Sequence, residues 1–201
     1  MKKILSMVLF VLILGSILTT ALVAVDRITK DPIDRNKALR LQKGILSSLA
    51  IEFDEKDKNG IAEKFSGDIE VIETPGEGGK PKKFYRSKMS GDIAFEVKGK
   101  GAQESIEATI ALSPNFEQVR GLSIVSQKET PGLGGRIEET EFLNRFKGKV
   151  ITNGLAITSP GKAAADNEVD GITGATLTCD ALEKLLNSEI KKYTVIFRES
   201  K

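Results

Sequence analysis

The hydrophobic pattern separates an apolar N-terminal segment from an alternating remainder. Residues 4–25 form an uninterrupted run of 22 residues without a charge. As a helix such a run is roughly 33 Å long, at about 1.5 Å per residue, and a hydrocarbon core is about 30 Å thick. A cleaved signal peptide is the alternative, but its apolar core is usually shorter, and no clean A-x-A site ends this run. We therefore expect residues 1–26 to be a transmembrane anchor.

Basic residues flank the anchor on both sides and give conflicting topology signals. Lys2 and Lys3 precede it, which favours a cytoplasmic N-terminus. The residues that favour the reverse are Arg27, Lys30, Arg35, Lys37, Arg40 and Lys43. Long domains cross membranes largely regardless of such charges. We expect a single-pass protein of the cell (inner) membrane with its domain on the extracytoplasmic side, and the opposite orientation stays open.

Residues 27–80 are predicted to be a helical and linker region. Ala38, Leu41, Ile45 and Leu49 fall on one stripe, which predicts a helix over residues 34–49 that Asp34 could cap. The sequence DEKDKNG at 54–60 indicates a polar turn, and TPGEGGKPKK at 74–83 a flexible connection.

Residues 81–201 carry the pattern of a folded domain. Apolar residues alternate with polar ones over 93–97 and 106–112, which predicts half-buried, antiparallel strands, and 119–126 is expected to be another strand. A short helix is expected over 137–146 and a final helix from Thr178 or Cys179 onward. The predicted fold is α+β: one N-terminal transmembrane helix, then a mainly antiparallel sheet with flanking helices.

Composition excludes several classes of function. The net charge is +2, with 30 basic residues scattered among 28 acidic ones, so no nucleic-acid partner is expected. The chain has no histidine and one cysteine. Zinc fingers, His-ligated haem, iron–sulfur clusters and Ser-His-Asp triads therefore cannot be built in their usual forms, and no metal site is expected. Redox chemistry would need an organic cofactor.

A first glycine-rich loop, Glu129-Thr130-Pro131-Gly132-Leu133-Gly134-Gly135, separates a predicted strand from a predicted helix. Pro131 fixes one φ angle, and the glycines allow close approach of the backbone to a ligand. A simple strand-to-helix turn has the same needs. Leu133 favours a ligand-binding loop over a simple turn, since its apolar side chain between glycines would be exposed unless it covered a bound ligand.

A second loop, Asp170-Gly171-Ile172-Thr173-Gly174-Ala175-Thr176-Leu177-Thr178, leads into the final helix. Small residues and hydroxyls at a helix start suit a phosphate, because backbone N–H groups and the helix dipole favour its negative charge. Thr176 or Thr178 could instead cap the helix. No Gly-Lys-Ser/Thr follows the glycines, so this is not a P-loop.

Both loops resemble motifs of the FMN-binding domain family. Residues 170–176 resemble the flavinylation motif Asp-x-x-Ser/Thr-Gly-Ala/Ser-Thr, and residues 129–134 match its companion Glu-Thr-Pro-Gly-Leu-Gly. The family includes the C subunit of the sodium-translocating NADH:quinone oxidoreductase (Nqr) and the G subunit of the Rnf NADH:ferredoxin oxidoreductase. The N-terminal anchor, the segment 36–46 and Gly99-Lys100-Gly101 fit the same layout.

The resemblance implies that FMN is bound covalently, as a phosphoester on Thr176. A flavin transferase would attach it from FAD with magnesium, and Asp170 would assist that enzyme. Thr173 and Gly174 would shape the loop and Ala175 would leave room, while Thr130, Leu133 and Gly134 would line the isoalloxazine ring. The full expected cofactor-binding set is Glu129, Thr130, Leu133, Gly134, Asp170, Gly171, Thr173, Gly174, Ala175 and Thr176.

The resemblance also implies a role as a redox subunit of an ion-translocating NADH oxidoreductase of the Nqr or Rnf type. Its partners would be the other membrane subunits and, during maturation, the transferase. No catalytic residue and no independent catalysis are expected. One alternative is an extracytoplasmic covalent-flavin carrier that serves another reductase, such as a fumarate reductase. Another is a membrane-anchored module that binds a ligand without electron transfer.

Two further residues have simple interpretations. Cys179 is interpreted as a small residue at the helix start, although a thiol near the flavin is conceivable. Lys162 is interpreted as a solvated loop lysine rather than a phosphate ligand.

Overall fold

The computed structural model describes residues 2–75 and 81–199. Contacts divide the chain into two compact units, Met1–Leu39 and Arg40–Lys201. The first helix, α1, covers Lys2–Ser48 without a break and contains Pro32. The sequence predicts two separate segments here, the anchor over 1–26 and a helix over 34–49, and an internal proline usually kinks or ends a helix. The structure corrects this to one helix.

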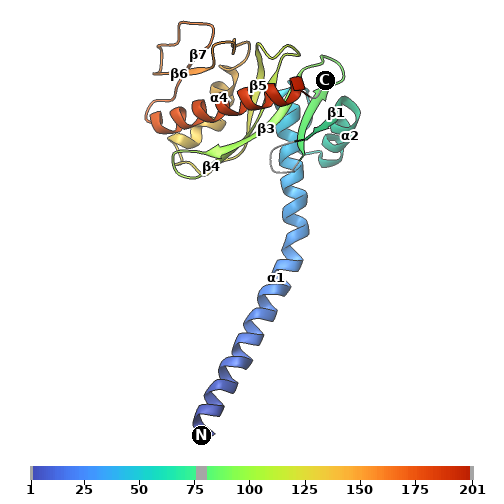
Figure 1. Cartoon of the computed structure of the whole chain (residues 1–201), viewed down its shortest axis with the longest axis vertical. Coiled ribbons are helices and arrows are strands. Elements are labelled where there is room, and N and C mark those ends of the chain that lie inside the picture. Colours follow the sequence, from blue (N-terminus) through green and yellow to red (C-terminus); the bar gives the residue numbers. More distant parts are fainter. Residues whose placement is uncertain (1, 76–80, 200–201) are drawn as a thin grey trace. The chain divides into compact units, whose positions relative to one another are not determined.

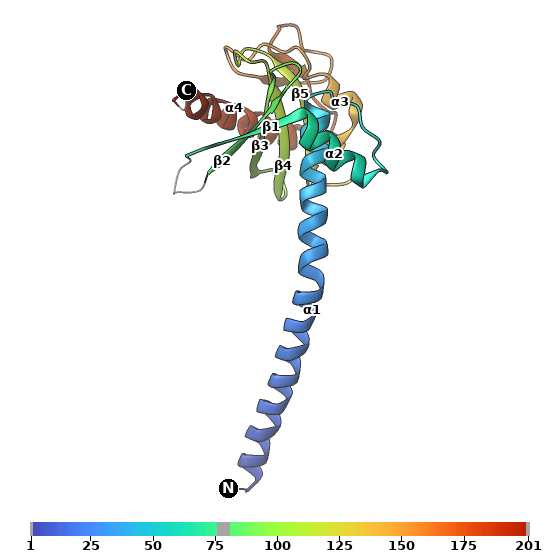
Figure 2. The same cartoon turned by 90° about the vertical axis from the view of Figure 1, so that its right-hand side faces the viewer.

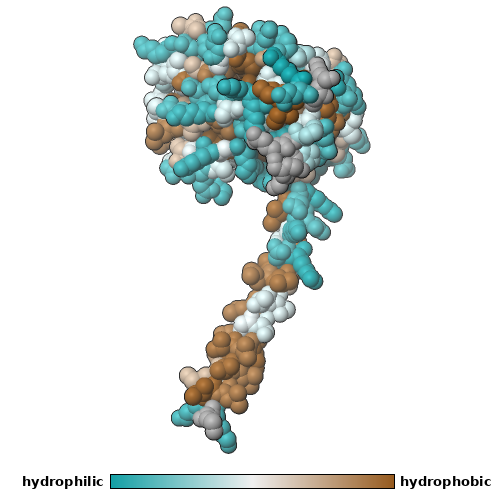
Figure 3. All heavy atoms as spheres, in the orientation of Figure 1, coloured by the Kyte–Doolittle hydropathy of each residue, from teal (hydrophilic) through white to brown (hydrophobic). Residues whose placement is uncertain are grey.

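The N-terminal part of α1 is the apolar run. All its described side chains up to Leu18 are exposed, and Figure 3 shows a hydrophobic surface there that gives way to hydrophilic side chains further along the helix. By length and composition, α1 is the one helix in the described residues that could cross a membrane.

The C-terminal end of α1 is buried within the second unit. Ile45 and Leu46 are fully buried. Gly44 allows the approach, because a Cβ atom there would lie 2.8 Å from Val125 Cγ2 and 3.0 Å from Thr109 Oγ1. The predicted stripe of residues 34–49 therefore packs against the sheet at its C-terminal end.

Helix α2 (Lys58–Asp68) follows, where only a polar turn over 54–60 is expected. Asp57 is its N-cap, and the Oδ1 atom accepts hydrogen bonds from the N–H groups of Asn59 at 3.1 Å and Gly60 at 3.0 Å. The polar residues thus include the start of a helix. Its pattern is weak, because it is short and contains Gly60 and Gly67.

The core of the second unit is a five-stranded antiparallel sheet. Its strands are β1 (Ile69–Thr74), β2 (Lys82–Ser87), β3 (Ile93–Lys100), β4 (Ser105–Leu112) and β5 (Val119–Ser126), and they pair in sequence order. The predicted strands β3 to β5 are confirmed. The prediction missed β1 and β2. These two strands pair with each other, although β1 lies before and β2 after the boundary expected between residues 80 and 81. The expected flexible connection falls partly in these strands, and its residues 76–80 lie outside the described part.

Four short elements follow the sheet. A 3₁₀ helix, η2 (Gly134–Glu138), and helix α3 (Thr140–Asn144) replace the single helix expected over 137–146, because Glu139 between them is extended. Phe142 and Phe146 are buried as that helix would have placed them, in edge-to-face contact at 5.2 Å. The unpredicted strands β6 (Ala156–Thr158) and β7 (Glu168–Asp170) form a parallel pair.

Helix α4 (Thr176–Glu199) crosses one face of the sheet (Figures 1 and 2). It begins two residues before the first predicted position, so Thr176 is helical. Tyr193 stacks on Phe95 at 4.3 Å and contacts Phe84 edge-to-face at 5.3 Å. Thr109, which faces the end of α1, is adjacent to Ile110, the partner of Phe95 in the sheet. Because neighbouring residues of a strand point to opposite faces, α4 and the end of α1 cover opposite faces.

Candidate functional site

The two glycine-rich loops meet at the start of α4. They enclose a pocket of about 310 Å³, which the turn between β3 and β4 completes. Its lining consists of Ala102, Gln103, Glu129, Thr130, Leu133, Gly134, Gly174, Ala175, Thr176, Leu177 and Thr178. Seven expected cofactor-binding residues are thus brought together: Glu129, Thr130, Leu133, Gly134, Gly174, Ala175 and Thr176. The expected residues Asp170, Gly171 and Thr173 do not line this pocket.

Glu129 fixes the first loop to its surroundings. Its side chain is buried, with 5% of the residue exposed. Oε2 accepts a hydrogen bond from the Thr178 hydroxyl at 2.7 Å, and Oε1 accepts one from the Gln103 N–H at 3.1 Å. One carboxylate therefore ties together the first loop, the first turn of α4 and the β3–β4 turn.

Two glycines make this close packing possible. A Cβ atom at Gly134 would lie 2.4 Å from Thr178 Oγ1, and one at Gly101 would lie 2.3 Å from Glu129 Oε1. These are distances that real Cβ contacts do not reach. The glycines of both segments are therefore required by protein packing around Glu129, independently of any ligand.

Hydrogen bonds of Asp170 and Arg145 fix the first residues of the second loop. Asp170 Oδ1 accepts hydrogen bonds from the N–H groups of Ala163 at 3.0 Å and Lys162 at 2.9 Å. The Ala163 hydrogen bond is the largest cause that lowers the pKa of Asp170. Arg145 Nη1 donates to the carbonyl oxygens of Asp170 at 3.0 Å and Gly171 at 3.2 Å. Asp170 thus stabilises the loop that precedes the pocket.

The two loops touch through Leu133 and Gly174. Gly174 has a φ of +79°, a left-handed conformation that favours glycine. A Cβ atom there would lie 3.0 Å from Leu133 Cδ2. Leu133 is 45% exposed and Leu177, on the other side of the pocket, is 76% exposed. Two exposed leucines at the rim supply an apolar surface next to a polar helix start.

The hydroxyl groups of the pocket differ in accessibility. Thr178 is buried, and its hydroxyl donates to Glu129. Thr176 is exposed, and no side-chain hydrogen bond of Thr176 is recorded within residues 2–75 and 81–199. The capping alternative is not favoured, because in that same part of the chain neither hydroxyl accepts a hydrogen bond from a backbone N–H. Thr176 therefore presents the free hydroxyl of the pocket.

The start of α4 suits a phosphate group. The first helical hydrogen bond recorded there runs from the Cys179 N–H to the Ala175 carbonyl at 2.9 Å. The N–H groups of residues 176–178 precede it, so they have no partner in the preceding turn. No acidic residue lies in the first turn of α4. Free N–H groups and the positive end of the helix dipole attract an anion.

Cys179 and Lys162 have structural explanations. Cys179 is 3% exposed, and burial raises the pKa of its thiol. A protonated, enclosed thiol is a packing residue rather than a reactive one. Lys162 is exposed, and its backbone N–H bonds Asp170.

Sequence reasoning missed the turn between β3 and β4 and the role of Arg145. The turn brings Ala102 and Gln103 to the pocket, although they lie 26 or more residues from either loop. Gly99-Lys100-Gly101 was a usable signal, since two glycines at a strand end indicate close approach of other segments. Nothing in the sequence distinguishes Arg145 from other surface arginines.

Comparisons with known proteins agree with this geometry. Residues 101–191 match the model of the FMN-binding domain family, which confirms the predicted resemblance. The chain is 33% identical over 96 residues to the C subunit of the Na(+)-translocating NADH-quinone reductase of Haemophilus ducreyi, with 45% of this chain and 37% of the relative covered. It is 29% identical over 160 residues to the same protein of Yersinia pestis, with 77% and 55% covered. The chain thus spans well under two thirds of the length of these relatives.

A solved structure has the same fold. The crystal structure of the C subunit of the Na(+)-translocating NADH-quinone reductase from Parabacteroides distasonis superimposes with a TM-score of 0.70 at 23% identity. The superposition covers 82% of this chain and 94% of that one. The predicted α+β fold is confirmed.

Proposed function

We propose, on the premise that residues 101–191 match the FMN-binding domain family, that this chain holds FMN covalently on Thr176. The observation that carries the proposal is the free, exposed hydroxyl of Thr176, in a pocket at the start of a helix. The residues fit the group: backbone N–H groups can bind its phosphate, and Leu133 and Leu177 can cover part of its ring. Bound FMN supplies the redox chemistry that the side chains of this chain lack.

Attachment requires an external enzyme. A threonine hydroxyl is a poor nucleophile without a base, and Glu129, the one carboxylate among the lining residues, accepts a hydrogen bond from Thr178 rather than from Thr176. A flavin transferase would supply the base and a magnesium ion. The Thr176 oxygen forms a bond to the FMN-side phosphorus of FAD, the pyrophosphate bond breaks, AMP leaves, and the hydroxyl proton passes to the base. The first turn of α4 positions the hydroxyl for this attack.

The chain acts as an electron-transfer subunit in this proposal. Relatives named as the C subunit of a Na(+)-translocating NADH-quinone reductase support a place in a membrane complex of the Nqr type. Helix α1 would anchor the chain, with the domain on the extracytoplasmic side. Other membrane subunits would deliver and accept the electrons. A complex of the Rnf type would use the same domain in the same way.

Mass spectrometry of the full-length chain tests the attachment. The chain is co-expressed with a flavin transferase, purified in detergent and compared with protein made without the transferase. We expect a mass increase of one FMN minus one water, and fragmentation should place it on Thr176 within the peptide that also contains Thr173 and Thr178. An unmodified chain, or an adduct on Thr173, would refute the proposal.

Co-purification tests the place in a complex. Membranes of the native host are solubilised, and the flavin-carrying chain is isolated under mild conditions. We expect membrane subunits of an NADH oxidoreductase to accompany it. A flavin-carrying chain that accompanies a different reductase would favour the general electron carrier, and a chain without flavin would favour the ligand-binding module.

A further inference from the structure

A single arginine outside both glycine-rich loops binds the second one. Arg145 follows directly after α3, and its Nη1 atom donates hydrogen bonds to the carbonyl oxygens of Asp170 at 3.0 Å and Gly171 at 3.2 Å. These oxygens belong to residues 25 and 26 positions further along the chain. Arg145 therefore makes a long-range contact with the segment that leads to Thr176.

The two carbonyl groups would repel each other without a cation between them. In a strand, successive carbonyl groups point in opposite directions, yet those of Asp170, the last residue of β7, and Gly171 converge on one nitrogen atom. The chain thus turns at Gly171. A Cβ atom there would lie 2.6 Å from the Thr158 carbonyl oxygen, so the turn is also tightly enclosed. Arg145 supplies the positive charge that offsets the two carbonyl dipoles.

The rest of the loop connects this contact to Thr176 through fixed residues. Ile172 is buried, and its carbonyl oxygen accepts a hydrogen bond from the Ala175 N–H at 3.1 Å. Gly174, within that turn, has a φ of +79°. The Ala175 carbonyl oxygen accepts the first hydrogen bond recorded for α4. A shift at Gly171 would therefore move the residues that begin α4.

The guanidinium group is itself held by its own helix. Its Nη2 atom donates to Glu141 Oε1 at 2.5 Å, and its Cζ atom lies 6.0 Å from the centre of the Phe142 ring, which is buried. The planar fork of arginine can bind a carboxylate and two carbonyl oxygens at once, whereas lysine carries its charge and its donors on one atom. The shape of Arg145, as well as its charge, suits this contact.

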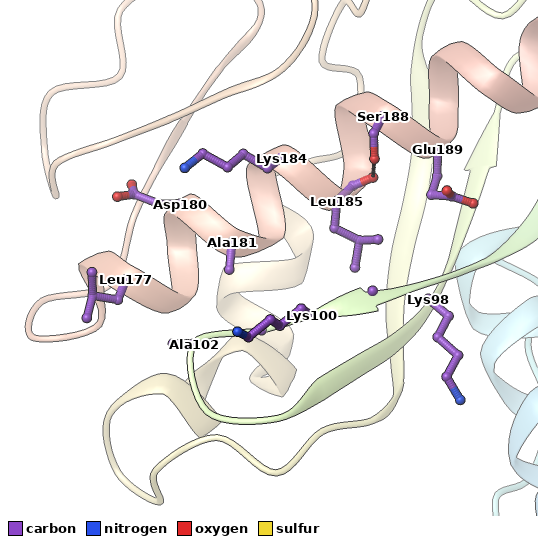
Figure 4. Close-up of a pocket in the computed structure, with 12 residues that line it drawn as sticks. Lys98, Lys100, Ala102, Leu177, Asp180, Ala181, Lys184, Leu185, Ser188 and Glu189 are labelled. Carbon is purple, nitrogen blue, oxygen red and sulfur yellow. Dashed lines mark hydrogen bonds between the residues drawn. The ribbon is translucent and has the colours of Figure 1, made fainter.

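Arg145 is not part of the hollows around Thr176. The pocket at the start of α4 adjoins a second hollow of about 640 Å³, between the end of β3 and the first turns of α4 (Figure 4). Ala102 and Leu177 line both. Among the residues described, Arg145 belongs to neither lining. Its effect on the Thr176 hydroxyl therefore passes through the loop.

We propose that Arg145 is a positioning residue for flavin attachment, which holds residues 170–175 so that the Thr176 hydroxyl is presented before FMN is bound. This inference rests on the proposed attachment, in which the FMN phosphate passes from FAD to the Thr176 oxygen and AMP leaves. The transferase then meets a preformed loop and does not have to order it. Preorganisation of this kind improves the apparent affinity, because only the competent fraction of the chain can bind.

Attachment kinetics with the chain as substrate test this role. Full-length chain made without the transferase is purified in detergent and incubated with flavin transferase, FAD and magnesium, and in-gel fluorescence measures covalent flavin at several chain concentrations. In Arg145→Gln we expect the KM for the chain to rise about tenfold and kcat to stay within about twofold, because losing hydrogen bonds to a charged group can change a loop population by that factor. Arg145→Lys should give an intermediate KM, because the charge remains.

Two control variants separate this role from the general loss of an arginine or of its ion pair. Arg136 in η2 pairs with Glu139 at 3.0 Å and, within the described residues, binds no carbonyl group of the second loop. Arg136→Gln should therefore keep the wild-type KM. Glu141→Gln removes the carboxylate that pairs with Arg145 but leaves the two hydrogen bonds to the second loop, so its KM should rise less than that of Arg145→Gln.

Three results would overturn the role of Arg145. The first is a wild-type KM in Arg145→Gln, and the second is an equal rise of KM in Arg136→Gln. The third is a lower kcat at an unchanged KM, because Arg145 would then act in the transfer step rather than on the loop. If Arg145→Gln does not fold, Arg145→Lys decides, and a wild-type KM in that variant would refute the proposal.

The proposed attachment fails in a different way. A wild-type chain that gains no adduct under these conditions refutes the attachment to Thr176, and the role of Arg145 is refuted with it. An adduct on Thr176 that forms equally well in the wild type and in all variants leaves the attachment intact and refutes only the role of Arg145.

Discussion

Thr176 and Thr178 are the same residue type in one helical turn, and the structure gives them opposite roles. Thr178 is buried, and its hydroxyl donates a hydrogen bond to Glu129. We call Thr178 and Glu129 the scaffold half of the pocket. Thr176 is exposed and belongs to the attachment half, with Gly174 and Leu177. Two residues along a helix correspond to a rotation of about 200°, so these two hydroxyls face in different directions. The comparison teaches that a motif can mix residues that build a site with residues that react in it.

The largest expected effect separates the two threonines. Thr176→Ala should abolish the covalent adduct, because the attacking oxygen is missing. Its unfolding free energy should change by no more than about 0.5 kcal/mol, since Thr176 is exposed. Thr176→Ser keeps an oxygen and should keep some adduct. In-gel flavin fluorescence and urea unfolding of the full-length chain measure both properties.

Thr178→Val should show the opposite behaviour. It removes the hydroxyl that bonds Glu129 and leaves a buried carboxylate oxygen without that partner, so it should destabilise the domain by about 1–3 kcal/mol. The adduct should still form in the protein that folds. If Thr178→Val lost the adduct while keeping full stability, the division of the pocket into two halves would be wrong.

Glu129 tests the scaffold half directly. Glu129→Ala removes one acceptor group that serves Thr178 and Gln103 and leaves both donors unsatisfied in a buried place. We expect a loss of about 2–4 kcal/mol, since each unsatisfied buried donor costs about 1–3 kcal/mol and water can partly compensate. Glu138→Ala, at an exposed position after the same loop, is the control. Chemical denaturation midpoints would separate the two, and equal midpoints would show that Glu129 is not a structural residue.

Sequence reasoning was most successful where the pattern is strong or the motif is specific. The alternation over 93–97 and 106–112 predicted β3 and β4, and a final helix was expected from Thr178 or Cys179 onward, close to the observed start of α4. The two loops gave most of the pocket, because a motif selects residues that function together wherever they lie in the fold. Which of these residues are buried scaffold could not be seen, since burial of Glu129 depends on a turn that contains Gln103.

The missed elements share a physical cause. Strands β1 and β2 are short, and neither has buried and exposed residues in strict alternation, so neither stands out by periodicity. Phe84 in β2 is buried because α4 supplies Tyr193 and Phe197 above it, which is a tertiary effect. The continuity of α1 through Pro32 also contradicts local preference. Local rules cannot predict outcomes that distant contacts decide.

Glycines provide a smaller test of the scaffold half. Gly134→Ala places a Cβ atom 2.4 Å from Thr178 Oγ1, so it should push the first loop away from α4 and cost about 1–3 kcal/mol. Gly67→Ala in α2 is the matched control, because a Cβ atom there meets nothing within 4 Å. In a helix that change should be neutral or stabilising by up to about 1 kcal/mol. Thermal unfolding should show a lower midpoint for Gly134→Ala and no lowering for Gly67→Ala, and an equal lowering in both variants would contradict the packing argument.

The smallest expected effect is the pH dependence of the stability that Asp170, the first residue of the second loop, contributes. Hydrogen bonds from the N–H groups of Ala163 and Lys162 help lower the pKa of Asp170 below its ordinary value of 3.8. A carboxylate whose pKa is lower in the folded state stabilises the fold above its ordinary pKa, and this contribution is lost as pH falls through the folded value. Asp170→Asn should therefore be less stable than wild type at pH 7. The difference should begin to shrink as pH falls below about 4, where the carboxyl of the unfolded chain takes up a proton, and it should disappear only below the lower pKa of the folded state.

Urea midpoints of wild type and Asp170→Asn between about pH 7 and pH 3 measure this convergence. The comparison isolates the charge, because asparagine keeps an oxygen that can still accept the hydrogen bonds from Ala163 and Lys162. A difference that stays constant over that range would mean that the charge of Asp170 does not hold the second loop. The attachment half would then be positioned by Arg145 and backbone geometry alone, and Thr176 would depend on its neighbours in the fold rather than on the first residue of its own motif.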